Sequence, residues 1–249
     1  MLEQATTTAC PLVLLHGLGV GPGAWTEQTR RFAVDRQVLA PAILRPGADK
    51  APFSIERAAS ELRAGLHERG LTRVDVCGFS VGGQVALWLA AAEPRLVRRL
   101  IVCAGYARLS ADMRSSALET AAELRALPDT LFQQTLHHLV VAVPDAYRGN
   151  ALQALAELSP DALACVMAEA ARFDITPRLS SFRLPTLIVC GDQDRWNLPL
   201  SQRLAATVPG AVFETVPNAG HFAFLDQPEL FAQAVRRFLD EDHRIARGV

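Results

Sequence analysis

Short apolar runs alternate with helical stretches along most of this 249-residue chain, and this alternation limits the folds that it can adopt. Strands that are apolar on both faces favour a parallel sheet covered by helices on both sides. The strand candidates are residues 12–15, 37–42, 74–77, 100–103, 186–190 and 212–216. Helical patterning lies between them, at residues 25–32, 55–69, 83–92, 200–207 and 229–240. We therefore predict an α/β fold with a doubly wound, mostly parallel sheet of about six strands.

One long segment breaks this alternation. Residues 109–179 contain no strong strand candidate, only helical patterning rich in Ala and Leu that Pro128, Pro144 and Pro160 divide. Since proline does not continue a helix, this predicts four short helices. A helical insertion after a strand, here the one that ends near Cys103, is typical of a cap over the carboxyl edge of the sheet, where ligands bind. We expect a core of residues 1–108 and 180–249 and a helical cap of residues 109–179.

A serine between two glycines stands at a predicted strand-to-helix junction, in Gly78-Phe79-Ser80-Val81-Gly82. In such a turn the serine side chain stands clear of the backbone, and the next helix points its N-terminus at whatever the serine attacks. The glycines are needed because a Cβ would collide across so tight a turn. The pattern also fits Ser80 as an ordinary helix N-cap, so a nucleophile additionally requires a base, an acid and an oxyanion site.

A glycine-rich loop, His16-Gly17-Leu18-Gly19, directly follows the first predicted strand. A backbone N–H of this loop, with the N–H of Val81, would form a two-donor oxyanion hole. The loss of one such donor costs roughly 3 to 4 kcal/mol of transition-state stabilisation. A plain turn between strand and helix is the alternative. We expect His16 itself to be structural, because a loop amide performs the oxyanion role.

A histidine and two carboxylates follow the last two predicted strands. His221 lies in a loop after the last strand, where it could take the proton of Ser80 and return it to the leaving group, or be a solvated loop histidine. Asp192 and Asp194 follow the strand before, and only one of them can orient His221. The order Ser, Asp, His is the one expected for this fold. The weaker histidine candidates are His67, His137, His138 and His243.

With these motifs the chain resembles the α/β-hydrolase superfamily, in the branch that carries a helical cap. The resemblance rests on L-L-H-G-L-G, G-F-S-V-G-G, G-D-Q-D and N-A-G-H-F, which together span nearly the whole chain. It implies a triad of Ser80, Asp194 and His221, because the family's acid commonly falls three residues after the glycine at the strand end. It also implies oxyanion donors at Leu18 and Val81. Overall the chain resembles bacterial carboxylesterases, enol-lactonases and acyl-carrier methylesterases.

Two departures from that family's pattern bear on the fold and the substrate. Members usually begin with a β-hairpin before the H-G strand, whereas only about ten residues precede it here. We therefore expect a reduced N-terminal hairpin and six parallel strands in place of eight. The loop after the second strand usually carries D-x-x-G-x-G-x-S, but residues 41–50 lack the Asp and the paired glycines. Since that loop borders the site in relatives, no single subfamily supplies the substrate by analogy.

Composition argues against several classes of protein. The formal net charge is −1 and no basic run occurs, so we expect no nucleic-acid partner. No apolar run of roughly 18 residues occurs and the N-terminus is polar, so we expect no membrane segment or signal sequence. The five cysteines have neither C-x-x-C nor zinc spacing, which predicts reduced thiols, a cytoplasmic location and no metal or organic cofactor. We expect a monomer or homodimer.

These observations predict a serine hydrolase that cleaves a small ester, lactone or thioester. Ser80 would attack the carbonyl, His221 would act as base and then acid, and Asp194 would orient His221. The apolar cap favours an acyl chain or ring as the small-molecule substrate. The same triad also serves carbon–carbon bond hydrolysis and lyase reactions, and a binding module is a third class. The arginines that could meet an anionic substrate are Arg45, Arg108, Arg172 and Arg195. Three aromatic residues beside the triad loops could line the pocket or simply pack: Trp196, Phe222 and Phe224.

Overall fold

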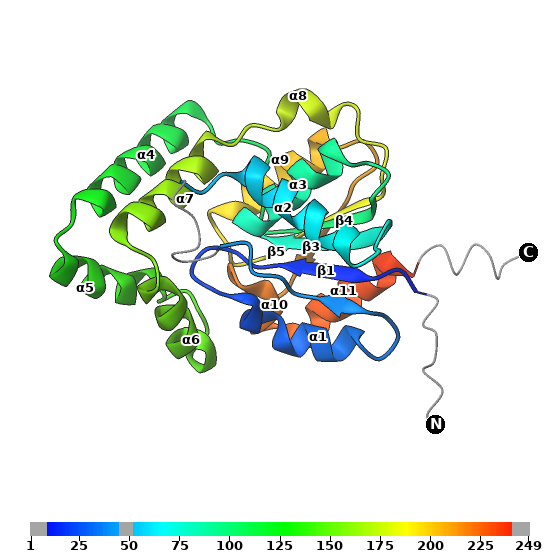
Figure 1. Ribbon diagram of the computed structural model, residues 1–249, viewed down its shortest axis with the longest axis horizontal. Coiled ribbons are helices and arrows are strands. Elements are labelled where there is room, and N and C mark those ends of the chain that lie inside the picture. Colours follow the sequence, from blue (N-terminus) through cyan, green and yellow to red (C-terminus); the bar gives the residue numbers. More distant parts are fainter. Residues whose placement is uncertain (1–8, 45–51, 241–249) are drawn as a thin grey trace, which may run out of the picture.

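A six-stranded sheet runs through the centre of the computed structural model, which describes residues 9–44 and 52–240 (Figure 1). The strand order is β2-β1-β3-β4-β5-β6, and every neighbouring pair is parallel. The predicted doubly wound α/β fold is confirmed. The strands are β1 (Leu12–Leu15), β2 (Val38–Leu39), β3 (Val74–Phe79), β4 (Val97–Cys103), β5 (Thr186–Gly191) and β6 (Val212–Val216).

The sheet reverses its winding direction between β1 and β3. From β1 the chain passes to β2 at one edge, and from β3 it continues through β4 and β5 to β6 at the other. In the register, Leu15 lies opposite Gly78, so the two strands end close together. Open parallel sheets bind ligands beyond the carboxyl ends of their strands at such a reversal. The loops that carry Leu18 and Ser80 leave the sheet at this point.

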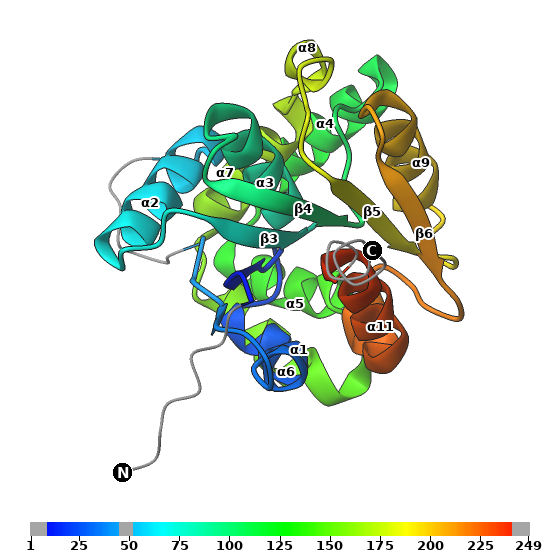
Figure 2. The ribbon, with the colours of Figure 1, turned by 90° about the vertical axis from the view of Figure 1, so that its right-hand side faces the viewer.

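Helices cover both faces of the sheet (Figure 2). Side chains alternate along each inner strand: Leu12 and Leu14 belong to one apolar cluster, whereas Val13 and Leu15 belong to the other. On the Leu12 face lie α1 (Thr26–Phe32) and α11 (Pro228–Leu239). The opposite face carries α2 (Ile55–Glu68), α3 (Val81–Ala92) and α9 (Asn197–Thr207). Two short helices, η1 (Pro22–Trp25) and α10 (Ala223–Asp226), lie in the connections that follow β1 and β6.

The two edges of the sheet differ from the sequence prediction. Residues 37–42 were expected to form a strand, but only Val38–Leu39 pair with β1. Pro41 has no N–H to donate to a ladder, and β2 has a neighbour on one side only. At the other edge β6 is partly exposed, and Val212 keeps 41% of its accessible surface. Full burial on both faces therefore holds for the inner strands and not for the edges.

The four helices predicted between Cys103 and the next strand are present. They are α4 (Ala111–Ala126), α5 (Asp129–Leu139), α6 (Asp145–Ala156) and α7 (Pro160–Arg172), followed by the short α8 (Thr176–Leu179). Pro128 and Pro144 occupy the positions just before α5 and α6, and Pro160 is the first residue of α7. We call α4–α7 the helical insertion; it extends beyond the carboxyl ends of the strands (Figure 1).

In the part of the chain that the structure describes, no single helix is long and apolar enough to cross a membrane. Only α6 and α7 taken together reach that length and composition, and they do so across a bend of 104°.

Candidate active site

Ser80 occupies a strained turn between β3 and α3. Its φ of 52° and ψ of −119° lie in a region that side-chain-bearing residues rarely adopt. The backbone holds the turn: the N–H of Ser80 donates to the carbonyl of Cys103 at 2.9 Å, and the N–H of Gly83 donates to the carbonyl of Ser80 at 2.8 Å. The Ser80 side chain makes no capping hydrogen bond to α3. Ser80 thus occupies the N-cap position of α3, but its hydroxyl does not cap the helix and is left at the carboxyl edge of the sheet.

The glycines around Ser80 are required by close contact between backbone segments. A Cβ on Gly78 would lie 2.2 Å from the carbonyl oxygen of Gly82. A Cβ on Gly82 would lie 2.5 Å from the carbonyl oxygens of both Leu15 and His16. No side chain fits at such distances. The second contact also fixes the N-terminus of α3 against the end of β1.

The predicted oxyanion loop lies against the serine. A Cβ on Gly17 would lie 3.1 Å from the Cβ of Ser80 and 2.7 Å from the ring of Phe79. The next residue, Leu18, is half-buried and packs against the apolar cluster on the Leu12 face of the sheet. Val81 is the first residue of α3, so its N–H has no partner within the helix. The structure thus gathers the loop, the serine and a free helix N-terminus at one edge.

His16 is a buried structural residue. Its Nδ1 lies 3.0 Å from the carbonyl oxygen of Gly17, and its Nε2 accepts the N–H of Ile43 at 3.1 Å. A neutral ring with its proton on Nδ1 satisfies both contacts. Burial lowers the pKa of His16 and outweighs the opposite effect of its backbone hydrogen bonds. The ring therefore ties the segment after β2 to the loop that carries Leu18.

Asp194 and His221 meet at the ends of β5 and β6. The Nδ1 of His221 lies 2.7 Å from Oδ2 of Asp194, whose side chain is only 6% exposed. Burial alone would raise the pKa of Asp194, but its hydrogen bond to His221, the charge of that ring and donors from Asn197 lower it below its ordinary value. The His221 ring packs 4.7 Å from the ring of Phe79, the residue that precedes Ser80. A carboxylate thus orients the His221 imidazole, whose ring packs against the residue before Ser80.

The structure separates the two aspartates that the sequence left as alternatives. Asp192 is exposed, and its Oδ1 accepts the N–H of Ala219 at 3.3 Å, so it holds the turn after β6. Asp194 is the one in contact with His221. A third carboxylate, Asp226, accepts the N–H of Gly220 at 2.8 Å and so anchors the histidine loop from α10. Burial raises the pKa of Asp226 despite that hydrogen bond.

Asn197 is a polar residue of the site that the sequence reasoning missed. Its Nδ2 lies 3.1 Å from Oδ1 and 2.9 Å from Oδ2 of Asp194, and 3.0 Å from Nδ1 of His221. Its backbone N–H also donates to Oδ1 of Asp194 at 3.0 Å. The helix was predicted to begin at residue 200, which left Asn197 in a loop. The signal was its position three residues after Asp194, because an aspartate carboxylate often accepts a backbone N–H a few residues further on.

The aromatic residues beside the triad loops divide into buried and exposed ones. Phe224 is fully buried and stacks on Trp25 with ring centroids 4.0 Å apart. Phe222 is 5% exposed and lies edge-on to the ring of His221 at 5.2 Å. Trp196 keeps 49% of its accessible surface and lies 6.1 Å from Tyr106. Phe222 and Phe224 thus support the histidine loop, whereas Trp196 faces outward.

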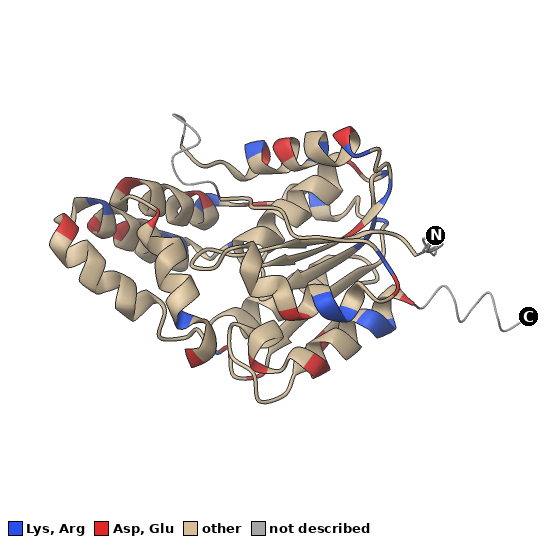
Figure 3. Ribbon diagram, turned by 60° about the horizontal axis from the view of Figure 1, so that its bottom comes forward, with Lys and Arg blue, Asp and Glu red and all other residues tan. Residues whose placement is uncertain are grey.

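The other singled-out residues do not converge on Ser80. Arg108, Arg172 and Arg195 are exposed, and Arg45 falls outside the described residues. Among the weaker histidines, His67, His137 and His138 are also exposed, and His243 is not described. Charged residues of both signs are interspersed over the outer helices (Figure 3).

The buried cysteines of the sheet are unreactive thiols. All five cysteines are free, and Cys77, Cys103 and Cys190 are buried in neighbouring strands. Burial raises the pKa of each of these thiols, that of Cys190 to about 12, so they stay protonated at neutral pH. Over residues 9–44 and 52–240, no group of three His, Cys, Asp or Glu side chains is arranged to hold a metal ion.

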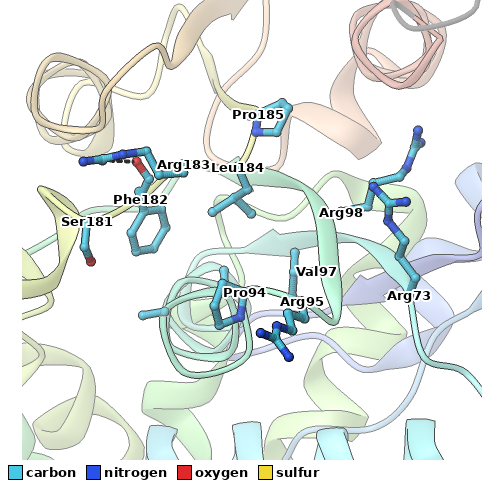
Figure 4. Close-up of a pocket in the computed structure, with 12 residues that line it drawn as sticks. Arg73, Pro94, Arg95, Val97, Arg98, Ser181, Phe182, Arg183, Leu184 and Pro185 are labelled. Atoms are coloured by element: carbon cyan, nitrogen blue, oxygen red, sulfur yellow. Dashed lines mark hydrogen bonds between the residues drawn. The ribbon is translucent and has the colours of Figure 1, made fainter.

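A hollow of about 670 Å³ lies at the opposite, amino-terminal edge of the sheet (Figure 4). It is lined by the end of α3, the start of β4 and residues 181–185. Its arginines point to different sides (Figure 4). Arg98 pairs with Asp75, and Arg183 donates to the carbonyls of Ser180 and Phe182. The hollow therefore lacks a convergent group of cations.

Comparison with known proteins identifies relatives over almost the whole chain. The family model described as the alpha/beta hydrolase family matches residues 12–234. The pimeloyl-[acyl-carrier protein] methyl ester esterase of Neisseria meningitidis serogroup A is 31% identical over 242 residues, which cover 91% of this chain and 76% of that protein. The polyketide synthase ThaQ of Burkholderia thailandensis is 30% identical over 255 residues. That match covers 95% of this chain, which spans only 12% of the length of the synthase.

The fold matches that of a solved ester hydrolase. A thermophilic esterase from Thermogutta terrifontis superposes with a TM-score of 0.80 at 25% sequence identity. The superposition covers 95% of this chain and 91% of the esterase.

Proposed function

Since the chain belongs to the alpha/beta hydrolase family, we propose that it is a serine hydrolase that cleaves a small carboxylic ester, lactone or thioester through an acyl-enzyme at Ser80. The observation that carries this proposal is the 2.7 Å contact between His221 and buried Asp194, at the same sheet edge as the strained turn of Ser80. The esterases among its relatives support ester hydrolysis in general.

Each group has a defined role in the proposed reaction. The hydroxyl of Ser80 attacks the substrate carbonyl while Nε2 of His221 takes its proton. Asp194 keeps the proton of the ring on Nδ1, which leaves Nε2 free as the base. The backbone N–H groups of Leu18 and Val81 stabilise the oxyanion of the tetrahedral intermediate. His221 then protonates the leaving group, and water hydrolyses the acyl-enzyme by the same steps.

The helical insertion supports an apolar acyl group as the substrate portion that lies in the site. Leu155 of α6 approaches the loop after β1, since a Cβ on Gly19 would lie 3.8 Å from its Cδ1. Leu158 and Leu163 belong to the same apolar cluster as this loop. We propose that residues 109–179 act as a cap over the Ser80 edge and that the partner is a small-molecule acyl compound. The chemistry uses side chains and backbone N–H groups alone, without a metal or organic cofactor.

The relatives suggest one finer substrate class. One is named a methyl ester esterase that acts on an acyl-carrier protein, and another is named a polyketide synthase. A methyl ester or thioester of a carrier-bound acyl chain therefore belongs among the candidate substrates, beside free esters and lactones.

The experiment that tests the proposal is covalent labelling together with turnover. A fluorophosphonate is expected to label Ser80, and the Ser80→Ala variant is expected to lose at least about 1,000-fold of the hydrolysis of nitrophenyl acetate. Ser116→Ala, at an exposed serine of α4, is the matched control and keeps both properties. Absence of label on a folded protein, shown by circular dichroism, contradicts the proposal. Labelling without turnover of any ester points instead to carbon–carbon bond hydrolysis or lyase chemistry on the same triad.

A panel of nitrophenyl esters from short to long acyl chains, with lactones, methyl esters and acyl thioesters added, measures the substrate class. The chain length at which kcat/KM falls reports the depth of the capped pocket.

A further inference from the structure

Asn197 contacts both the acid and the base of the proposed triad. Its side-chain amide bridges the two carboxylate oxygens of Asp194 at 3.1 and 2.9 Å, and its nitrogen lies 3.0 Å from Nδ1 of His221. Asn197 is 7% exposed, so water has little access to compete for these contacts. Three polar groups therefore share one buried space at the start of α9.

The donors and acceptors of this cluster can be satisfied together in one way. When Nδ1 of His221 carries the ring proton, this nitrogen donates to Oδ2 of Asp194 at 2.7 Å and cannot accept a hydrogen bond from Asn197. The amide of Asn197 then donates only to the carboxylate. Oδ1 of Asp194 also accepts the backbone N–H of Asn197 at 3.0 Å. The carboxylate is thus held from the α9 side, with a lone pair of Oδ2 directed at the imidazole.

The backbone and the side chain of Asn197 contribute separately. The N–H at this position starts α9 and remains when the side chain is replaced, so Oδ1 keeps one donor in any variant. Only the side chain reaches Oδ2, the oxygen that contacts His221. Without it the carboxylate can rotate about its remaining contacts, and a smaller share of molecules presents Oδ2 to the ring. Loss of the side chain is therefore expected to slow the reaction without disrupting the start of α9.

We infer that Asn197 is a positioning residue, whose amide fixes the Asp194 carboxylate in the orientation that holds His221. This inference rests on the proposed function of Ser80, Asp194 and His221. Asn197 does not touch substrate or a reacting atom; it acts through Asp194.

A double-mutant cycle tests this role. A hydrogen bond to a charged group is typically worth a factor of about 10 to 100, so Asn197→Leu, which keeps the branched shape but loses the donors, is expected to lower kcat about 10- to 30-fold. KM for nitrophenyl acetate is expected to stay within about twofold, because the side chain contacts no substrate. In the Asp194→Asn background the same change is expected to cost less than about twofold, because groups that act as one unit are not additive.

Controls separate this inference from a merely structural role and from the proposed function. Asn150→Leu, at an exposed asparagine of α6, is expected to leave kcat unchanged. If Asn197→Leu does not fold, Asn197→Ser is too short to bridge the carboxylate and is expected to give the same loss. An equal loss in both Asp194 backgrounds, or no loss in the single variant, overturns the inference. Neither result touches the proposed function, which fails only if wild type escapes the fluorophosphonate or Ser80→Ala keeps its activity.

Discussion

The sheet edge that carries Ser80 and the helical insertion that faces it are held in place by different means. At the edge, backbone contacts backbone: besides Gly78 and Gly82, a Cβ on Gly191 would lie 2.2 Å from the carbonyl oxygens of Ala219 and Gly220. In the insertion, helices pack through side chains, and α4 and α7 lie along each other. Backbone contact fixes positions closely, whereas side-chain packing tolerates exchange of residues. Residues of the insertion can therefore be exchanged while the turn of Ser80 stays in place.

Hydrogen bonds attach α7 of the insertion to the core. The side chains of Gln84 and Tyr106 both donate to the carbonyl of Ala170, at 3.2 and 3.0 Å. On the preceding residue, the carboxylate of Glu169 accepts the N–H of Ile55, the first residue of α2, at 3.0 Å. Farther from this anchor, α5 and the turn after it leave Leu131 48% and Val141 63% exposed. This part of the insertion thus leaves some apolar side chains exposed.

The largest expected effect comes from a methyl group added at the sheet edge. Gly82→Ala is expected to lower the free energy of unfolding by about 4 kcal/mol or more, because its Cβ would meet two carbonyl oxygens at 2.5 Å. Gly149→Ala, in α6, is the matched change in the insertion, since no atom lies within 4 Å of the added Cβ. It is expected to raise stability by about 0.5 to 1 kcal/mol. Urea unfolding of both variants measures the difference, and equal effects would remove the distinction between the two regions.

A smaller loss of stability is expected when an aspartate charge is removed from the core in one variant and from the insertion in another. Asp75 of β3 is fully buried and receives two hydrogen bonds from Arg98, at 2.8 and 2.6 Å. Burial raises the pKa of Asp75 even though Arg98 opposes the shift. Asp75→Asn removes a buried carboxylate charge that two guanidinium groups face, Arg98 at 2.6 Å and Arg36 at 3.9 Å, and is expected to cost about 3 kcal/mol. In the insertion, Asp161 pairs with Arg125 at 2.8 Å but is 71% exposed, so Asp161→Asn is expected to cost about 0.5 kcal/mol or less.

This expectation is contradicted if Asp161→Asn lowers the free energy of unfolding as much as Asp75→Asn does. Thermal unfolding at pH 7 in low and high salt adds a check, because salt screens the exposed pair more than the buried one.

The difference between local patterns and contacts between distant segments explains how much of the structure could be predicted from the sequence. Patterns along the chain predicted β1 and β6 at their observed bounds, and the prolines predicted the divisions between the insertion helices, because both are local properties. Motifs predicted Ser80, Asp194 and His221 at one edge of the sheet, since parallel strands all end at the same edge. What the sequence did not reveal depends on contacts between distant segments. The ion pair of Asp75 with Arg98 and the end of β2 at Leu39 are of this kind.

Asn197 was missed for a related reason. Its role depends on which side-chain atoms face Asp194, and no pattern of residue types specifies that. The preference for Asp194 over Asp192, in contrast, followed from the spacing after Gly191, which the structure supports by placing Asp194 against His221.

The smallest expected effect is on the pH dependence of the free energy of unfolding, and it comes from the buried His16. Because burial holds the pKa of His16 below its ordinary value of 6.5, the unfolded chain binds a proton near this pH that the folded chain does not. The stability that His16 contributes is therefore present above about pH 6.5 and is lost as the pH falls toward the lowered value. The slope is at most about 1.4 kcal/mol per pH unit for one proton.

A matched pair of variants isolates this contribution. Urea unfolding between pH 7 and pH 5 is expected to have a shallower slope in His16→Gln than in wild type. His137→Gln, at an exposed histidine of the insertion, is the matched control variant. A wild-type slope in His16→Gln would mean that the buried ring takes up its proton in the folded state. The hydrogen bond between Ile43 and His16 would then break in acid, and the edge held by backbone contacts would be less rigid than its glycines indicate.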